Sequence, residues 1–174
     1  RNVQGGYLYS ATGSDTIYYI DKQSVIPKYR IDFGPNAVSA KDLMASRFAG
    51  HTIPNLLAQE GPYLETGELF YFNMMRENGA GKYLMDAVFR NNQTGELIRV
   101  QDDDVLFLAS QHASGLTLQN EFVTAIDAGR FMTKADSVLN NRQFVCPEAV
   151  KAQIRQLKED DNPVIVFYTL KWLP

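Results

Sequence analysis

The amino-acid sequence predicts an all-β protein, and three observations support this prediction. Short runs rich in Tyr, Ile and Phe recur along the chain, separated by turns that contain Gly, Asn or Ser. A similar arrangement of these runs returns after about 50 residues. The chain of 174 residues is 45% hydrophobic and 21% charged, which is the composition of a globular protein with enough length to bury a core.

The strand-like runs fall into three groups along the chain. The first group is a meander of three runs, the second repeats this layout and adds a fourth run, and the third is weaker and is completed by a run near the end of the chain. The predicted strands span residues 7–11, 16–21 and 28–33, then 63–65, 68–74, 82–89 and 96–100, then 116–118, 121–126 and 164–172.

The spacing of the groups indicates repeated units. Aligning TIYYI with ELFYF places Ile17 on Leu69, 52 positions later, and Lys28 on Lys82, 54 positions later. Phe122 lies 53 positions after Leu69. Self-similarity at this period, with about four short strands per unit, is typical of β-propeller blades and not of a sandwich or a Rossmann unit.

The sequence therefore predicts β-propeller blades with short helical insertions. Three units make about half of a propeller. The expected boundaries are a blade at 1–60, a blade at 61–110, and a blade at 111–174 that carries a helical insertion at 128–160.

Three helices are expected between the strands. Ser39 followed by Asp42 resembles a capping box before a short helix. Asp127 is placed to cap a second helix, and the third is predicted at 147–159, with Pro147 in its first turn. The apolar residues expected on the buried faces of these helices are Leu43, Met44 and Phe48, then Phe131, Ala135, Val138 and Leu139, then Val150, Ile154 and Leu157.

Charge and composition exclude two classes of partner. The formal net charge is -3 and the Lys and Arg residues are scattered, so the sequence predicts no nucleic-acid partner. No apolar run approaches the roughly 18 residues needed to cross a bilayer, so no transmembrane segment is expected. The single cysteine, Cys146, excludes an internal disulfide and leaves the compartment open.

The start of the chain suggests a piece of a longer protein. It begins at Arg1, without an initiator Met or the pattern of a signal peptide, and soon enters a strand-like run. Half a propeller leaves unpaired strand edges. We therefore expect the chain to be unstable alone, dimeric, or bound to a partner chain such as the missing N-terminal half of the propeller.

Three segments carry a resemblance to a known family. DTIYYIDKQSVIPKYRIDFG, the later hairpin ending in KYLMDAVF, and the C-terminal KEDDNPVIVFYTLK together resemble the six-bladed β-propeller proteins of Bacteroidetes-type bacteria, distant relatives of NHL and TolB-like propellers. The resemblance covers nearly the whole chain and corresponds to the C-terminal half of such a protein. It implies an exported protein of the periplasm or cell surface, such as an outer-membrane lipoprotein, and it supplies no catalytic residues.

Asp102, Asp103 and Asp104 are the candidate metal ligands. Clustered carboxylates can hold Ca²⁺, which takes six to eight oxygen ligands, and some propellers carry such an ion in the central channel. The spacing is not that of an EF-hand loop, and successive carboxylates cannot all point inward. A solvated turn is the alternative, and otherwise no cofactor is expected.

His51 and His112 are the candidate ligand-binding residues, because each is expected in a loop or insertion. A surface or hydrogen-bonded structural role is the alternative for both. No catalytic residue is predicted, since the chain has no G-x-S-x-G elbow and GAGK at 79–82 lacks the spacing of a phosphate loop.

These observations favour a non-enzymatic binding or scaffolding module, such as an accessory lipoprotein in nutrient uptake that binds a peptide, a glycan or a partner protein. The alternative is a metal-dependent hydrolase of the lactonase or lyase kind, with its site in the propeller channel. Converging carboxylates around a metal would favour the enzyme, whereas loop aromatics around an empty channel would favour binding.

Overall fold

The structure is a computed structural model that describes residues 5–11, 13–49, 53, 56–80, 82–101, 113–140 and 147–170. The chain divides into two compact units, of which described residues up to 101 form the first and residues 113–170 belong to the second. The first unit contains β1 (Tyr7–Tyr9), β2 (Thr16–Ile20), β3 (Val25–Arg30), the 3-10 helix η1 (Gly34–Asn36), α1 (Ala40–Ala49), β4 (Leu57–Glu65), β5 (Leu69–Glu77), β6 (Tyr83–Asn91) and β7 (Leu97–Val100). The second contains β8 (Gly115–Leu116), β9 (Phe122–Ile126), α3 (Ala128–Asn140), α4 (Glu148–Gln156) and β10 (Val164–Tyr168).

The first sheet has the order β1-β2-β3, and both pairings are antiparallel. Its second turn lies earlier than predicted, because the Asp21 carboxylate accepts hydrogen bonds from the backbone N–H groups of Gln23 and Ser24. β3 therefore begins at Val25, whereas the sequence predicted a strand from residue 28.

The second sheet has the order β4-β5-β6-β7 and is also antiparallel throughout. β4 is longer than the predicted strand 63–65, because it begins at Leu57 and continues through an irregularity. Its pairing register with β5 shifts between Glu60 and Leu64, where the Gly61–Pro62 peptide bond is cis.

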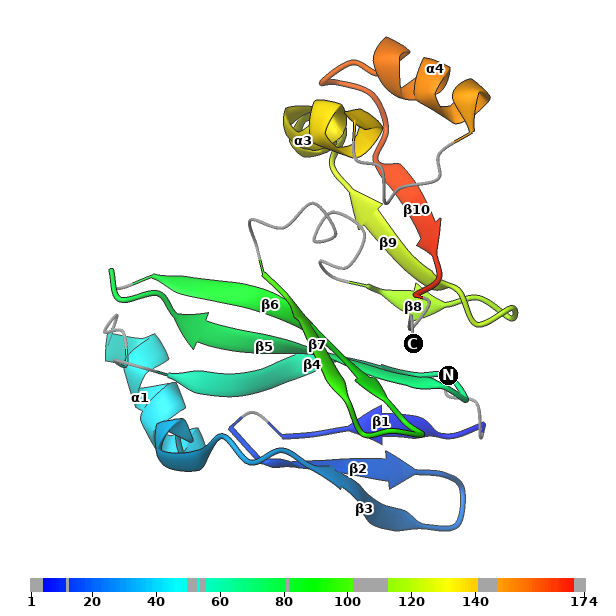
Figure 1. Cartoon of the computed structure of the whole chain (residues 1–174). Helices are drawn as coiled ribbons and strands as arrows, with labels where there is room; N and C mark the ends of the chain where they lie inside the picture. Colours follow the sequence, from blue (N-terminus) through cyan, green and yellow to red (C-terminus); the bar gives the residue numbers. More distant parts are fainter. Residues whose placement is uncertain are drawn as a thin grey trace. The chain divides into compact units, whose positions relative to one another are not determined.

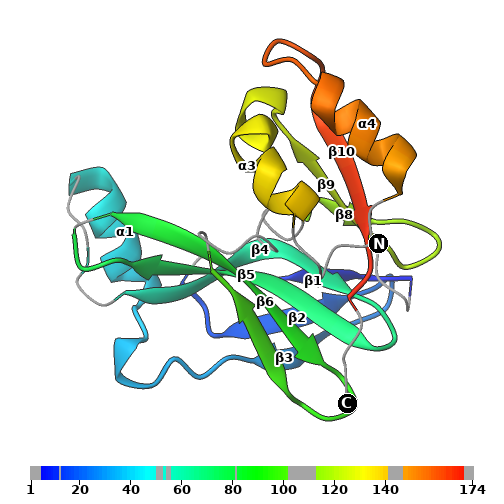
Figure 2. The same cartoon turned by 45° about the horizontal axis from the view of Figure 1, so that its top comes forward.

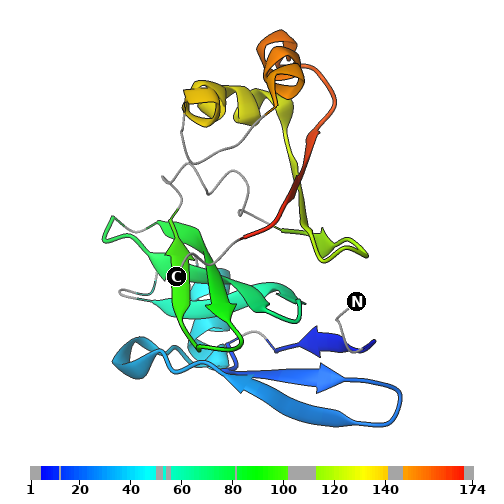
Figure 3. The same ribbon diagram turned by 45° about the vertical axis from the view of Figure 1, so that its right-hand side comes forward.

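The two sheets of the first unit pack face to face (Figures 1 and 3). Ile17 of β2 belongs to one buried cluster with the second-sheet residues Phe70, Phe72, Met74 and Val88. Alternate residues of a strand share a face, so the three β5 members of this cluster all come from the face that meets the first sheet.

The helix α1 begins as predicted and covers part of the second sheet. The Ser39 hydroxyl accepts the N–H of Asp42 at 3.2 Å and donates to the Asp42 carboxylate at 2.6 Å, so Ser39 caps the helix. Leu43 then packs against Leu56, Ala58 and Met75.

The second unit has the sheet order β10-β9-β8, with α3 and α4 inserted between the paired strands β9 and β10. Figure 2 shows both helices on the same side of these two strands. Phe131 of α3 and Ile154 of α4 pack in one apolar cluster with Ile126, Val164 and Val166. The helical insertion expected within 128–160 is thus present, although α4 ends at Gln156, where Leu157 turns to an extended conformation.

The all-β prediction is confirmed, because the described chain consists mainly of antiparallel sheets with few helices. The repeat positions Ile17, Leu69 and Phe122 are all buried and lie on inner strands of the three sheets. The sheets do not close into a ring, so a propeller is not shown. Among the described residues, no helix is both long and apolar enough to span a membrane.

Candidate functional site

None of the five candidate site residues is placed by the structure. His51 and His112 lie outside the described residues, and so do Asp102, Asp103 and Asp104. Within the described ranges there is no group of three or more His, Cys, Asp or Glu residues that could hold a metal ion. The calcium site and the two histidine contacts therefore stay predictions.

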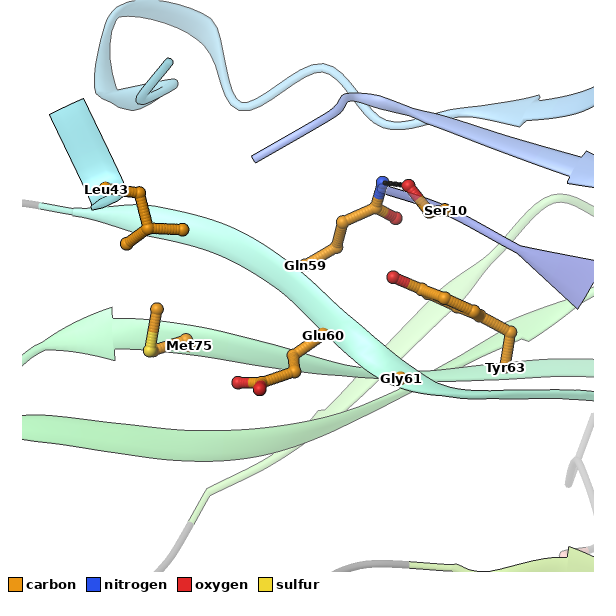
Figure 4. A pocket seen from close by; sticks show the side chains of 7 residues that line it. All are labelled: Ser10, Leu43, Gln59, Glu60, Gly61, Tyr63 and Met75. Atoms are coloured by element: carbon orange, nitrogen blue, oxygen red, sulfur yellow. Dashed lines mark hydrogen bonds between the residues drawn. The ribbon is translucent and has the colours of Figure 1, made fainter. Parts of the chain in front are cut away.

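A small cavity with both polar and apolar lining residues lies beside β4 in the first unit. Its volume is about 180 Å³, which corresponds to roughly six water molecules at the volume that each occupies in the liquid. The irregular part of β4 supplies most of its wall, and β1, α1 and β5 complete it (Figure 4). The lining residues are Ser10, Leu43, Gln59, Glu60, Gly61, Tyr63 and Met75.

Gln59 is the central polar residue of this cavity, and only 6% of its surface is exposed. Its Nε2 donates to the Ser10 hydroxyl at 3.0 Å and to the backbone carbonyl of Ser14 at 2.7 Å. Because a backbone carbonyl can only accept, these contacts fix which end of the amide is the nitrogen. The amide oxygen Oε1 is therefore turned away from Ser14.

That amide oxygen is buried and has no hydrogen-bond partner among the described residues. Figure 4 shows it facing the space in front of the Tyr63 hydroxyl. A buried acceptor without a partner costs about 1–3 kcal/mol, so a group that donates a hydrogen bond to Gln59 would be stabilised here.

Tyr63 and Ser10 add two hydroxyl groups. Burial, as the main cause, raises the pKa of Tyr63 to about 12; a Ser10 hydrogen bond opposes the shift, and the negative charge of Glu60 adds to it. The Tyr63 hydroxyl therefore keeps its proton at neutral pH. The Ser10 hydroxyl also donates to the Thr16 carbonyl at 2.7 Å.

A second cavity of about 290 Å³ lies next to the first along the same strand. The two share no lining residue, yet Gln59 joins them through its bond to Ser14. Asp15, at the wall of the second cavity, pairs with Arg30 at 2.7 Å. A hydrogen bond from Thr16 is the main cause that lowers the pKa of Asp15, and Arg30 contributes to the same shift.

Sequence reasoning did not find Gln59 or Tyr63 as site residues. Neither belongs to a motif, and Gln59 meets Ser10 only because β1 and β4 are brought together in the fold. The Gly61-Pro62 pair was the available signal, since this dipeptide within a strand marks an irregularity in pairing.

Comparison with known proteins shows one structural likeness. No protein-family model and no curated protein matches the chain. A crystal structure of a "Putative exported protein (BF0058)" from Bacteroides fragilis NCTC 9343 is similar to the chain with a TM-score of 0.57 and 12% sequence identity. The likeness covers 96% of this chain and 48% of that protein, so the chain spans about half of its length. At this identity the likeness shows the fold alone.

Proposed function

We propose that the chain is a non-enzymatic binding module that takes a neutral glycan in the cavity beside β4. The observation that carries this proposal is the buried Oε1 of Gln59, which has no hydrogen-bond partner in the described part of the chain. A ligand hydroxyl can donate to this oxygen and accept from the Tyr63 hydroxyl with the same atom, which suits the two groups that face the cavity.

The remainder of the lining fits the same class of ligand. Leu43 and Met75 give the cavity an apolar side, and sugars combine apolar C–H faces with hydroxyl groups. The cavity is smaller than the roughly 300–1,000 Å³ of drug-sized sites, so it would hold a single sugar residue and leave the rest of the glycan outside.

We place this module in an exported protein with β-propeller blades. Support for export comes from the Bacteroides fragilis protein, which is described as a "putative exported protein", and from the family resemblance of the sequence. Support for blades comes from the three antiparallel sheets that follow one another along the chain, with aligned buried positions at Ile17, Leu69 and Phe122.

The metal-dependent hydrolase stays the alternative for this fold. Its expected ligands Asp102, Asp103 and Asp104 lie outside the described residues, so no geometry bears on it. The two proposals differ in one measurable respect, because glycan binding beside β4 needs no metal. Binding that survives treatment with a chelator fits the binding module.

The test is a titration of the ¹⁵N-labelled chain with neutral monosaccharides, followed by NMR. We expect saturable shifts of the backbone signals of Gln59 and Tyr63. Gln59→Leu has nearly the same size and lacks the acceptor, so it should weaken binding by about tenfold or more. Gln93→Leu is the matched control, because Gln93 is exposed in the β6–β7 turn.

Equal sugar affinity in Gln59→Leu and in the unmodified chain would refute the proposed site. A further arm uses an uncharged blocked peptide in place of the sugar. Saturable shifts at Gln59 with the peptide alone would overturn the glycan assignment and favour a peptide ligand.

A further inference from the structure

A second polar cluster of different chemistry lies on β5, β6 and β7. Asp86 of β6 is fully buried, and its Oδ2 accepts hydrogen bonds from Nε of Arg76 on β5 and from Nε of Arg99 on β7, each at 2.7 Å. In the strand registers both arginines lie diagonally across from Asp86. The alternation of side chains therefore puts all three on one face of the sheet.

The cluster carries more positive than negative charge. One carboxylate faces two guanidinium groups, which leaves a net charge of +1. Asp86 engages both arginines through a single oxygen, and its buried Oδ1 has no hydrogen-bond partner within the described ranges. Asp86 therefore holds both guanidinium groups next to the same carboxylate oxygen. Its single negative charge balances only one of their two positive charges.

Most N–H groups of the two arginines make no hydrogen bond to any described residue. A guanidinium has five N–H donors, and the bond to Asp86 uses one of them. In the part of the chain that the structure describes, neither Arg76 nor Arg99 makes a further hydrogen bond. The side chain of Arg99 is 41% exposed, so its remaining donors can be reached from the solvent.

The Asp15–Arg30 pair has the same Nε-to-carboxylate distance as the Asp86 contacts, but its positive and negative charges are equal in number. Arg30 Nε also lies 2.7 Å from a carboxylate Oδ2, but there one arginine meets one aspartate. That pair is neutral, and 79% of the Arg30 side chain and 43% of the Asp15 side chain are exposed. The excess positive charge is therefore a property of the Asp86 cluster and not of arginine pairing in general.

We propose that Arg76 and Arg99 form a binding site for an oxyanion, the group shared by a phosphate and by the carboxylate of an acidic sugar. Asp86 is the positioning residue, which holds both guanidinium groups by Nε and leaves their terminal N–H groups for the ligand. Paired N–H groups of arginine match the two oxygens of a carboxylate or phosphate, and the bound anion neutralises the excess charge. This site is independent of the cavity beside β4.

The test is a titration of the full ¹⁵N-labelled chain with inorganic phosphate, in which sodium chloride keeps the ionic strength constant. The Nε–Hε signals of Arg76 and Arg99 should shift together and saturate in the millimolar range. The Arg30 signal in the same spectrum is the internal control and should not saturate. A parallel titration with glucuronate distinguishes the two sources, because saturation by one anion alone identifies a phosphate site or an acidic-sugar site.

Two variants separate recognition by the arginine fork from simple attraction to charge. Arg99→Lys keeps the charge and loses the paired donors, so it should weaken anion binding about tenfold, whereas Arg30→Lys should leave it unchanged. The proposal is overturned if the Arg76 and Arg99 signals only follow that of Arg30 with both anions. It is equally overturned if Arg99→Lys binds the anion as tightly as the unmodified chain.

Discussion

Glu65 of β4 forms a charged contact between the two sheets of the first unit. This buried carboxylate at the end of β4 accepts a hydrogen bond from the Tyr29 hydroxyl and pairs with Lys28 Nζ at 2.6 Å, and both partners belong to β3. The Tyr29 ring also stacks on Phe70 of β5, with ring centroids 4.1 Å apart. One tyrosine thus contributes an apolar and a polar contact to the same interface.

We expect the first unit to lose stability at alkaline pH, because the pKa values of the Tyr29 and Tyr63 hydroxyls are raised in the folded state. Burial is the main cause that raises the pKa of both hydroxyls, to about 12 for Tyr63, and the Glu65 contact adds to the shift of Tyr29. In the unfolded chain both hydroxyls release their protons near pH 10. Their contribution is therefore complete below about pH 10 and is lost as the pH rises through the folded pKa.

Urea denaturation at several pH values checks this prediction. The free energy of unfolding should fall from about pH 10 upward, and the fall should be shallower in Tyr63→Phe, which removes one of the two groups. Between about pH 6 and 8 the two tyrosines should contribute no slope, since they keep their protons in both states. The same alkaline slope in the variant and in the unmodified chain would contradict the assignment.

At three boundaries of secondary-structure elements a polar side chain binds the backbone. Ser39 caps α1, Asp21 closes the turn between β2 and β3, and Asp127 accepts the N–H of Arg130 at 3.1 Å in the first turn of α3. Because Ser and Asp are favoured at such positions, the starts of α1 and α3 could be predicted from the residue type, whereas the turn closed by Asp21 was predicted too late in the chain.

The cap that Asp127 provides to α3 should contribute to the stability of the second unit. Asp127→Ala removes the cap of α3 and should lower the free energy of unfolding of the second unit by about 1 kcal/mol, as measured by urea denaturation. Asp127→Asn is the matched control, because its side-chain oxygen can accept the same hydrogen bond. Equal destabilisation by both variants would show that the charge of Asp127, and not its cap, matters.

The two strands whose starts were predicted wrongly share one cause. Both contain a proline, and the predicted strands 28–33 and 63–65 begin at the residue just after it. β3 tolerates Pro27 because it is an edge strand and its register with β2 shifts at the same place, between Ile17 and Tyr18. β4 tolerates Pro62 where its own register with β5 shifts. The strand propensity of the neighbouring residues could not predict that the register shifts between strands would accommodate the proline rings.

At the scale of the whole chain, the grouping of strands was predictable and the candidate site was not. The hydrophobic runs and their spacing predicted three antiparallel groups in the right order, since these depend on neighbouring segments. The cavity beside β4 depends on Gln59 meeting Ser10 and Ser14 across two sheets. Such a meeting leaves no periodic signal in the sequence.

The outer strands of the sheets predict self-association. Large apolar side chains are exposed on β1, β3, β7 and β10, each of which is an edge strand, and Ile165 on β10 is 51% exposed. Strand edges that no other described strand pairs with can pair with another chain. A partner chain at these edges stays a prediction.

Light scattering over a wide range of concentrations should give a mass above that of a single chain. Ile165→Lys places a charge on the edge and should reduce the association. Leu118→Lys is the matched control, because Leu118 is 98% exposed in a turn and belongs to no strand. A mass that stays at one chain at every concentration would argue against the proposed blades.

The insertion of α3 and α4 between β9 and β10 also sets an order of folding. The short β8–β9 hairpin can close as soon as its residues are available, whereas β10 can dock on β9 only after the intervening chain has been spanned. Shortening that span by forming the two helices first lowers the entropy lost on closure. During synthesis the β9 edge therefore stays open until Tyr168 has left the ribosome, and that interval is when this unit is most exposed to misfolding.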